Sequence, residues 1–237
     1  MKSAVLVLAL VAACRAGGLG GDAGTSNSGG DGGVAISGRV CLLADLRKPA
    51  SCSATGAKGL VVSLGTRTIT IADDHDDGTF TLGVPLGTDL TWHVTSSTLD
   101  RIVPSAMSFG TDHTLPVVTT QLYRDLLSTN GVEILDQQGS IVVRVIRGVM
   151  PVANVSARST PASSVTLYDR DNSLLDWNES PIGATGSAGV VWFPGVPLSL
   201  RPPTLATITL SPEGGTQVST LATVENQTIT FVTKQLP

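Results

Sequence analysis

The 237-residue chain is poor in charged and aromatic residues, and both shortages limit the partners that it can be expected to bind. Only 14% of the residues are charged, and 15 basic against 19 acidic residues give a formal net charge of −4. Nucleic-acid binding needs a basic footprint, so no nucleic-acid partner is expected. Three Trp, two Tyr and four Phe provide few rings for an exposed aromatic platform, which makes carbohydrate binding a weaker alternative.

Common catalytic and cofactor motifs are missing as well. The sequence has no G-x-S-x-G, no P-loop and no G-x-G-x-x-G. None of the histidines, His75, His93 and His113, has a glutamate three residues later, so the H-x-x-E zinc-ligand pair is absent. We therefore expect a non-enzymatic protein with no catalytic residue, metal ligand or cofactor. His93 alternates with apolar neighbours and is expected to be an exposed strand residue, and His113 is expected to be solvated.

The apolar run at the N-terminus is too short to cross a membrane as a helix. Ala4 to Ala13 has ten residues, whereas a spanning helix needs about 20. It follows the positive start Met1-Lys2-Ser3, which predicts a secretory signal peptide over residues 1–13. The end of the run, LVAAC, resembles the bacterial lipobox, and this resemblance implies a lipidated Cys14. The alternative is an ordinary signal peptide with Cys14 incidental.

Residues 14–33 are predicted to be a lipidated cysteine followed by a flexible tether. Half of the segment from Ala16 to Gly33 is glycine, so it cannot build a core. Arg15 stands where aspartate often marks inner-membrane retention in lipoproteins. The resemblance therefore implies an exported protein that is anchored by lipid to the outer membrane of a bacterial envelope, on its periplasmic or surface side.

Cysteine is scarce, and its number is odd. If Cys14 carries lipid, Cys41 and Cys52 remain as one pair around a short polar segment. Export favours a disulfide between them, which would contribute about 2–3 kcal/mol in the chain-entropy model. The alternative is two free buried thiols.

What the chain does contain is apolar alternation with period two, which predicts an all-β protein. The segments that show this pattern, or read as strands between turn signals, are 67–71, 78–84, 89–94, 140–146, 164–169, 189–193, 205–210, 216–224 and 227–233. Helical spacing interrupts the strands over Gln121 to Ser128, with Thr119 or Thr120 as N-cap and Asn130-Gly131 as the stop. We expect two small transthyretin-like or immunoglobulin-like β-sandwiches, residues 34–109 and 137–237, joined by a linker at 110–136 that contains this short helix.

The two predicted domains share a sequence pattern. GVPL occurs at Gly83–Leu86 and again at Gly195–Leu198, each time after a glycine turn and an aromatic strand. This repetition supports two copies of one supersecondary plan.

Residues 36–94 resemble the carboxypeptidase regulatory-like domain, a transthyretin-like β-sandwich. The residues that carry the resemblance are Gly38, Val40, Val62, Leu64, Gly78, Phe80, Val84, Pro85 and Gly87. The second half matches more loosely, through Gly189, Phe193 and Val196-Pro197, and Ser199 stands where the corner glycine is expected. These are structural residues, so the resemblance implies a fold and hardly any function.

The most suggestive local motif is ADDHDDGTF, residues 72–80. Asp and Gly are typical turn residues, so the sequence predicts a solvated hairpin turn at Gly78. Weak cation binding by Asp73, Asp74, Asp76 and Asp77, or an active site, are alternatives. A second acidic stretch, Tyr168–Asp176, starts like a calcium loop but has Leu174 at the sixth position, where glycine is required.

Together these features predict a non-enzymatic lipoprotein of the cell envelope that acts as a structural or protein-binding module. Its partner is a protein or a glycan that the sequence does not identify. The alternatives are a carbohydrate-binding accessory lipoprotein and an enzyme with a site near the acidic turn.

Overall fold

The structure is a computed structural model that describes residues 34–49, 51, 53, 55–72, 74–84, 91–98, 101–108, 113–170, 174–179, 183–200 and 203–237. These residues belong to one compact unit, Gly32–Pro237. The predicted signal peptide, the tether, Cys14, Cys52 and Asp73 lie outside the described residues.

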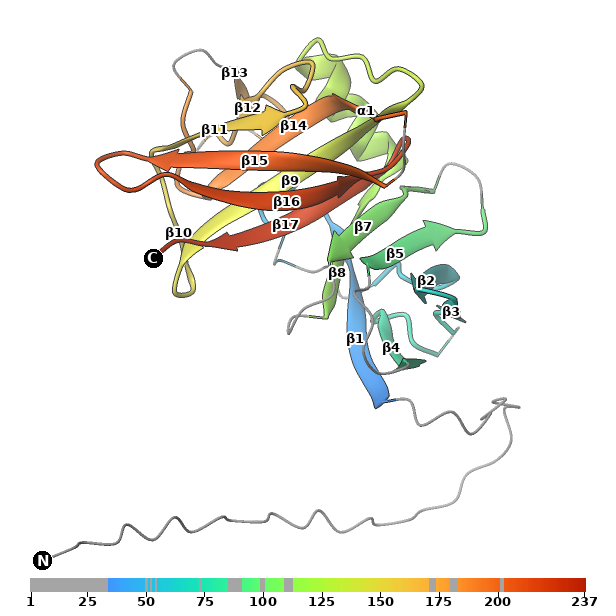
Figure 1. Ribbon diagram of the computed structural model, residues 1–237. Helices are drawn as coiled ribbons and strands as arrows, with labels where there is room; N and C mark the ends of the chain where they lie inside the picture. The colour runs from blue at the N-terminus through green and yellow to red at the C-terminus, as the bar shows by residue number, and fades with distance from the viewer. Residues whose placement is uncertain are drawn as a thin grey trace, which may run out of the picture. The chain divides into compact units, whose positions relative to one another are not determined.

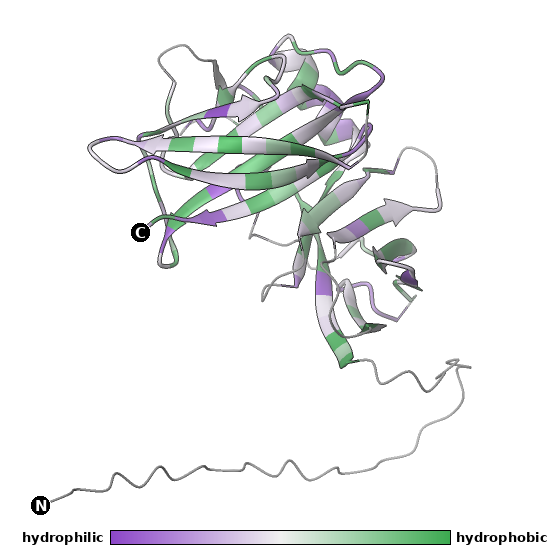
Figure 2. Ribbon diagram, viewed as in Figure 1, coloured by the Kyte–Doolittle hydropathy of each residue, from purple (hydrophilic) through white to green (hydrophobic). Residues whose placement is uncertain are grey.

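The all-β prediction is confirmed (Figure 1). The strands are β1 (Val34–Leu43), β2 (Leu60–Leu64), β3 (Arg67–Thr70), β4 (Thr79–Val84), β5 (Thr91–Ser96), β6 (Ile102–Val103), β7 (Ser105–Ser108), β8 (Thr114–Thr119), β9 (Gln138–Arg147), β10 (Met150–Pro151), β11 (Val155–Thr160), β12 (Leu167–Tyr168), β13 (Asn178–Glu179), β14 (Val190–Pro197), β15 (Thr204–Pro212), β16 (Val218–Val224) and β17 (Ile229–Gln235). Every predicted strand segment overlaps one of them. Figure 2 shows green, hydrophobic bands alternating with nearly white bands along β15 and β16, where aliphatic residues alternate with Thr and Ser.

The strands form three sheets. One has the order β4-β1-β8-β6, a second runs β13-β12-β14-β9-β17-β7-β5-β2-β3 with β10 on β9, and the third is β11-β15-β16. The first sheet packs on the β7-β5-β2-β3 end of the second around a core that includes Val62, Phe80, Trp92 and Leu115. The third sheet packs on the β14-β9-β17 part around Val143, Phe193 and Ile208.

The division into two separate domains is not confirmed, because one sheet runs through both halves of the chain. β17 lies between β9 and β7 and is parallel to both, with Ile229 opposite Ser140 and Ser105. Backbone hydrogen bonds therefore connect residues 105–107 directly to the C-terminal strand. Strand alternation in the sequence carries no information about a parallel partner more than 100 residues away.

The region predicted as a linker contains a central strand as well as the predicted helix. β8 pairs with β1 in parallel and with β6, and its residues Leu115 and Val117 are buried in the first core. The helix α1 (Thr120–Thr129) begins at the predicted N-cap, where the Thr119 hydroxyl oxygen accepts from the Leu122 N–H at 3.2 Å. It ends at Asn130, as predicted.

A hydrogen-bonded ion pair ties the two halves together beside the shared sheet. His93 on β5 lies 2.7 Å, Nε2 to Oε1, from Glu225 in the β16–β17 turn. His93 points away from the core that buries Trp92 and Val94, as expected, but its side chain is only 32% exposed because it faces this carboxylate. His113 is also engaged, since its Nδ1 lies 3.1 Å from the Ser37 carbonyl oxygen. The bond to Glu225 raises the pKa of His93, against the opposing effect of burial.

We expect the ion pair to make stability depend on pH. A raised pKa in the folded state means that the contribution is fully present below the unfolded value of about 6.5 and is lost as the pH rises through the folded value. Glu225 is 36% exposed, so screening limits the effect to less than about 1 kcal/mol. Urea unfolding at acidic and alkaline pH should show this loss in the wild type. Glu225→Gln and His93→Gln should both reduce it, whereas His75→Gln should not, and an unchanged pH dependence in both of the first two variants would contradict the assignment.

Candidate functional site

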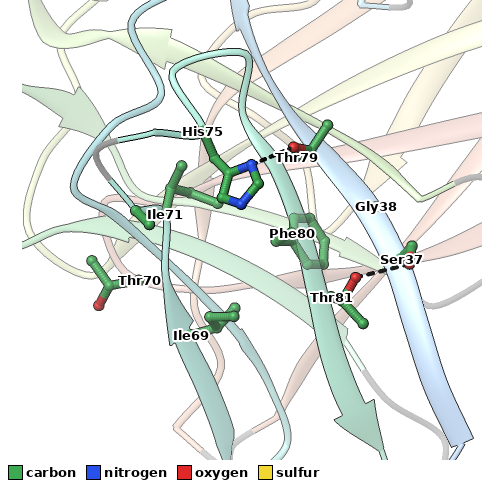
Figure 3. Close-up of a pocket in the computed structure, with 10 residues that line it drawn as sticks. Ser37, Gly38, Ile69, Thr70, Ile71, His75, Thr79, Phe80 and Thr81 are labelled. Atoms are coloured by element: carbon green, nitrogen blue, oxygen red, sulfur yellow. Dashed lines mark hydrogen bonds between the residues drawn. The ribbon is translucent and has the colours of Figure 1, made fainter. Parts of the chain in front are cut away.

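A cavity of about 420 Å³ opens between β3 and β4, at the edge of the region where the first sheet packs on the β7-β5-β2-β3 end of the second (Figure 3). We call it the edge groove. Among the described strands, β3 and β4 are the terminal strands of two different sheets, so each pairs on one side only. The residues that line the groove are Ser37, Gly38, Ile69, Thr70, Ile71, Ala72, His75, Thr79, Phe80 and Thr81.

The inner wall of the groove is apolar and closely packed. Ile71 and Phe80 are buried, and the Phe80 ring meets Trp92 edge-on at 5.6 Å between centroids. Gly38 stands opposite Phe80 in the β1–β4 register. A Cβ at Gly38 would overlap the Phe80 ring and the His113 carbonyl oxygen, so only glycine leaves room for the ring.

The rim of the groove carries hydroxyl groups. Ser37 Oγ and Thr81 Oγ1 are 2.9 Å apart across β1 and β4, and His75 Nδ1 lies 3.2 Å from Thr79 Oγ1 (Figure 3). An apolar wall below a rim of hydroxyls is suited to a ligand that alternates apolar and polar groups, as an extended peptide does.

The acidic motif forms the turn that leads from β3 to β4 at one end of the groove. The predicted turn is present, but the prediction of a hairpin is wrong, because β3 and β4 pair with β2 and β1 in different sheets. The Asp77 carboxylate accepts from the Thr79 N–H at 3.1 Å, and Asp76 accepts from the Gly56 N–H at 3.0 Å. The bond from the Thr79 backbone, followed by the bond from the Thr79 hydroxyl, holds the pKa of Asp77 below its usual value. Two of the aspartates thus hold backbone groups of the turn and of its neighbouring loop.

The geometry of the described aspartates lends no support to a metal site. No group of three or more His, Cys, Asp or Glu side chains in the described part of the chain is placed to hold a metal ion. Asp76 and Asp77 accept from different backbone N–H groups, and Asp73 lies outside the described residues. Weak cation binding by the turn stays a prediction.

Asp74, His75 and Thr79 follow the acid–imidazole–hydroxyl order of a nucleophilic triad, but their geometry differs from it. Asp74 Oδ1 is 3.9 Å from His75 Nε2, which is beyond hydrogen-bond distance, and these side chains are 82% and 54% exposed. The Thr79 hydroxyl donates to Asp77 at 2.9 Å, so its proton is directed away from the imidazole. The groove therefore supports binding better than it supports catalysis.

The second acidic stretch contains a structural residue that sequence reasoning missed. The buried Asp169 carboxylate accepts from the N–H groups of Gly186, Ala188 and Val190 at 2.9–3.0 Å and so holds the turn before β14. Burial raises the pKa of Asp169, while these bonds oppose the shift. Its backbone donors lie about 20 residues away, so no local pattern could have indicated the contact.

The described aromatic side chains do not form a platform for sugar rings. All eight of them are buried, namely Phe80, Trp92, Tyr123, Tyr168, Trp177, Trp192, Phe193 and Phe231, and Phe109 lies outside the described residues. This burial disfavours the carbohydrate-binding alternative.

Comparison with known proteins gives no relative from which a function could be transferred. No protein-family model, no curated protein and no solved structure matches the chain. Within the described residues, no helix has the length and apolar character that crossing a membrane would need. The functional interpretation of the candidate site therefore rests on the geometry of the site.

Gly78 is predicted to be essential for the turn beside the groove. It has φ 80°, and a Cβ there would overlap the Val40 carbonyl oxygen. Gly78→Ala should therefore reduce the free energy of unfolding by about 2 kcal/mol or more. Gly83→Ala on β4 is the control, because nothing lies within 4 Å of its added Cβ, and it should change stability by less than about 1 kcal/mol. Equal urea midpoints for the two variants would contradict this role of Gly78.

Proposed function

We propose that the chain is a non-enzymatic, lipid-anchored protein of the cell envelope, and that the edge groove makes it a protein-binding module. The observation that carries this proposal is the position of an apolar, hydroxyl-rimmed groove between two strands that each pair on one side only. Terminal strands offer backbone donors and acceptors to an added strand, and adjacent pockets give such binding its side-chain specificity.

The expected ligand is an extended segment of a partner protein. Added beside β3 or β4, it would direct alternate side chains toward Ile69 and Phe80 and the others toward the hydroxyls of the rim. Asp74, Asp76 and Asp77 at the β3–β4 turn favour a cationic side chain at that end of the segment. Because the chain as a whole is acidic, a basic partner would also be attracted at long range.

Site-specific photo-crosslinking in intact envelopes tests the groove. A photoreactive residue at Thr81 should give a discrete protein adduct, because this side chain lies on the rim. Thr223 on the outer face of β16 is the matched control and should give none. Ile69→Glu in the Thr81 background should reduce the adduct by about tenfold, since a charge in the apolar wall opposes binding. Equal adducts from both positions, or none from Thr81, would refute the groove as a protein-binding site.

The lipid anchor is proposed at Cys14. Its support is the lipobox-like LVAAC sequence and the glycine-rich segment between it and the folded body, both of which lie outside the described residues. A flexible tether would let the groove reach a partner at a distance from the bilayer. Arg15 stands where aspartate often marks inner-membrane retention in lipoproteins, so it favours anchoring in the outer membrane.

Radioactive palmitate labelling tests the anchor. The wild-type chain should incorporate label, and Cys14→Ser should reduce incorporation to background, because the thioether-forming sulfur is removed. Cys52→Ser serves as the control and should label normally. Equal labelling of the wild type and Cys14→Ser would end the lipoprotein proposal without affecting the groove.

We also infer the carboxypeptidase regulatory-like plan for the first half and a Cys41–Cys52 disulfide. The support for the first is that Gly38 and Phe80, two residues of the resemblance, are register partners, and that Gly78 accepts from the Val40 N–H at 2.8 Å. The support for the second is that Cys41 is fully buried on β1 and that Cys41 and Cys52 bracket one short polar segment of the sequence.

A further inference from the structure

The hairpin between β9 and β10 exposes two adjacent apolar side chains. Arg147 pairs with Met150, which leaves Gly148 and Val149 as a two-residue loop. Val149 is 82% exposed and Met150 is 67% exposed. We call these two residues the apolar tip. Figure 1 shows the β10 hairpin beside the end of β17.

The turn geometry does not require apolar residues at this place. Gly148 already supplies the positive φ, 62°, so a polar residue at position 149 would serve the turn as well. Two other hairpin loops among the described residues are polar: Gly65-Thr66 joins β2 to β3, and Glu213–Gln217 joins β15 to β16. The apolar tip is therefore explained better by a surface that covers it than by folding.

The strands that lead to the tip carry cations in an otherwise acidic protein. Arg147 lies at the end of β9, and Lys234 lies opposite Val145 on the parallel strand β17, so both side chains are on the same face of the sheet. Arg144 also lies on β9, but on the other face of the sheet. No acidic residue occurs between Asp136 and Asp169, or after Glu225. Arg147 Nε donates to the Pro237 carbonyl oxygen at 3.0 Å, which holds the guanidinium beside the hairpin.

Two acidic residues lie on segments packed near this hairpin. Asp169 is buried and accepts three backbone N–H groups, so its charge is directed inward. Glu213 lies in the β15–β16 turn, where its backbone N–H donates to the Asn154 carbonyl. Neither of them lies on β9, β10 or β17, the strands that carry the tip and its cations.

We propose that the apolar tip inserts into the headgroup region of an anionic bilayer, with Arg147 and Lys234 placed over the anionic headgroups. Apolar side chains gain by leaving water, and cations near an anionic surface gain by charge attraction. The contact is a second membrane attachment that does not depend on lipid at Cys14. On an anchored chain even a weak contact would orient the body, because the anchor raises the effective concentration of the tip at the membrane.

Tryptophan fluorescence of the full chain reconstituted with vesicles tests this contact. The three native tryptophans, Trp92, Trp177 and Trp192, are buried, so an indole introduced by Val149→Trp provides a separate signal. Phosphatidylglycerol–phosphatidylcholine vesicles with brominated acyl chains should shift its emission to the blue and quench it by about twofold, because the indole enters the lipid. Leu221→Trp, on the exposed face of β16, is the control and should not respond.

The charge requirement is tested with the same reporter. Arg147→Gln and Lys234→Gln combined, and separately vesicles of phosphatidylcholine alone, should each abolish most of the quenching. Met150→Trp is the second reporter, for the case that Val149→Trp does not fold. The proposal is overturned if both reporters are unresponsive, if Leu221→Trp responds equally, or if phosphatidylcholine alone gives the same quenching. It is also overturned if the reporter responds only to added envelope protein, because the tip would then contact a protein.

Discussion

The parallel insertion of β17 between β9 and β7 is the constraint on which the rest of the architecture depends. Its backbone groups connect the strands of the first half to those of the second, so residues 32–237 fold as one compact unit. β17 pairs with a strand on each side. This position in the middle of the sheet explains why its first residues, Ile229 to Phe231, are buried although the strand lies near the end of the chain.

This central pairing also decides where the free edges of the structure lie. With the middle of the long sheet occupied by β9, β17 and β7, β3 is left at one end and β4 is left at the end of the facing sheet. The edge groove lies between these two strands, and the acidic turn closes one end of it. A strand edge that lacks a neighbour can pair with an added strand, so an edge with an apolar wall and a hydroxyl rim is consistent with the proposed partner binding.

Charged side chains are also distributed unevenly over the described residues. Three Asp side chains lie at the turn beside the groove, whereas the β9–β10 hairpin and the end of β17 carry only cations. On the two proposals made above, the groove would attract a basic segment and the apolar tip an anionic surface. Such a division would let one small body contact a membrane and a partner at different places.

Local features of the fold were predictable because short-range rules determine them. Alternation located the strands, Thr119 and Asn130 marked the ends of the helix, and Gly78 marked the turn. The groove was predictable only in part. The motif at its end was recognised, but its walls come from β1, β3 and β4, and nothing in the sequence indicates that Ser37 meets Thr81.

The sequence by itself determined the class of the fold, the positions of its strands and the nature of the acidic turn, because each depends on residues within a few positions of one another. Only the tertiary structure decided that the halves share one sheet, that His93 meets Glu225, that Asp169 is a buried anchor and that β3 and β4 border a groove. These features depend on contacts between segments that lie from about 20 to more than 100 residues apart. Hydrophobic periodicity records which face of a strand is buried, and it carries no record of the strand's neighbour.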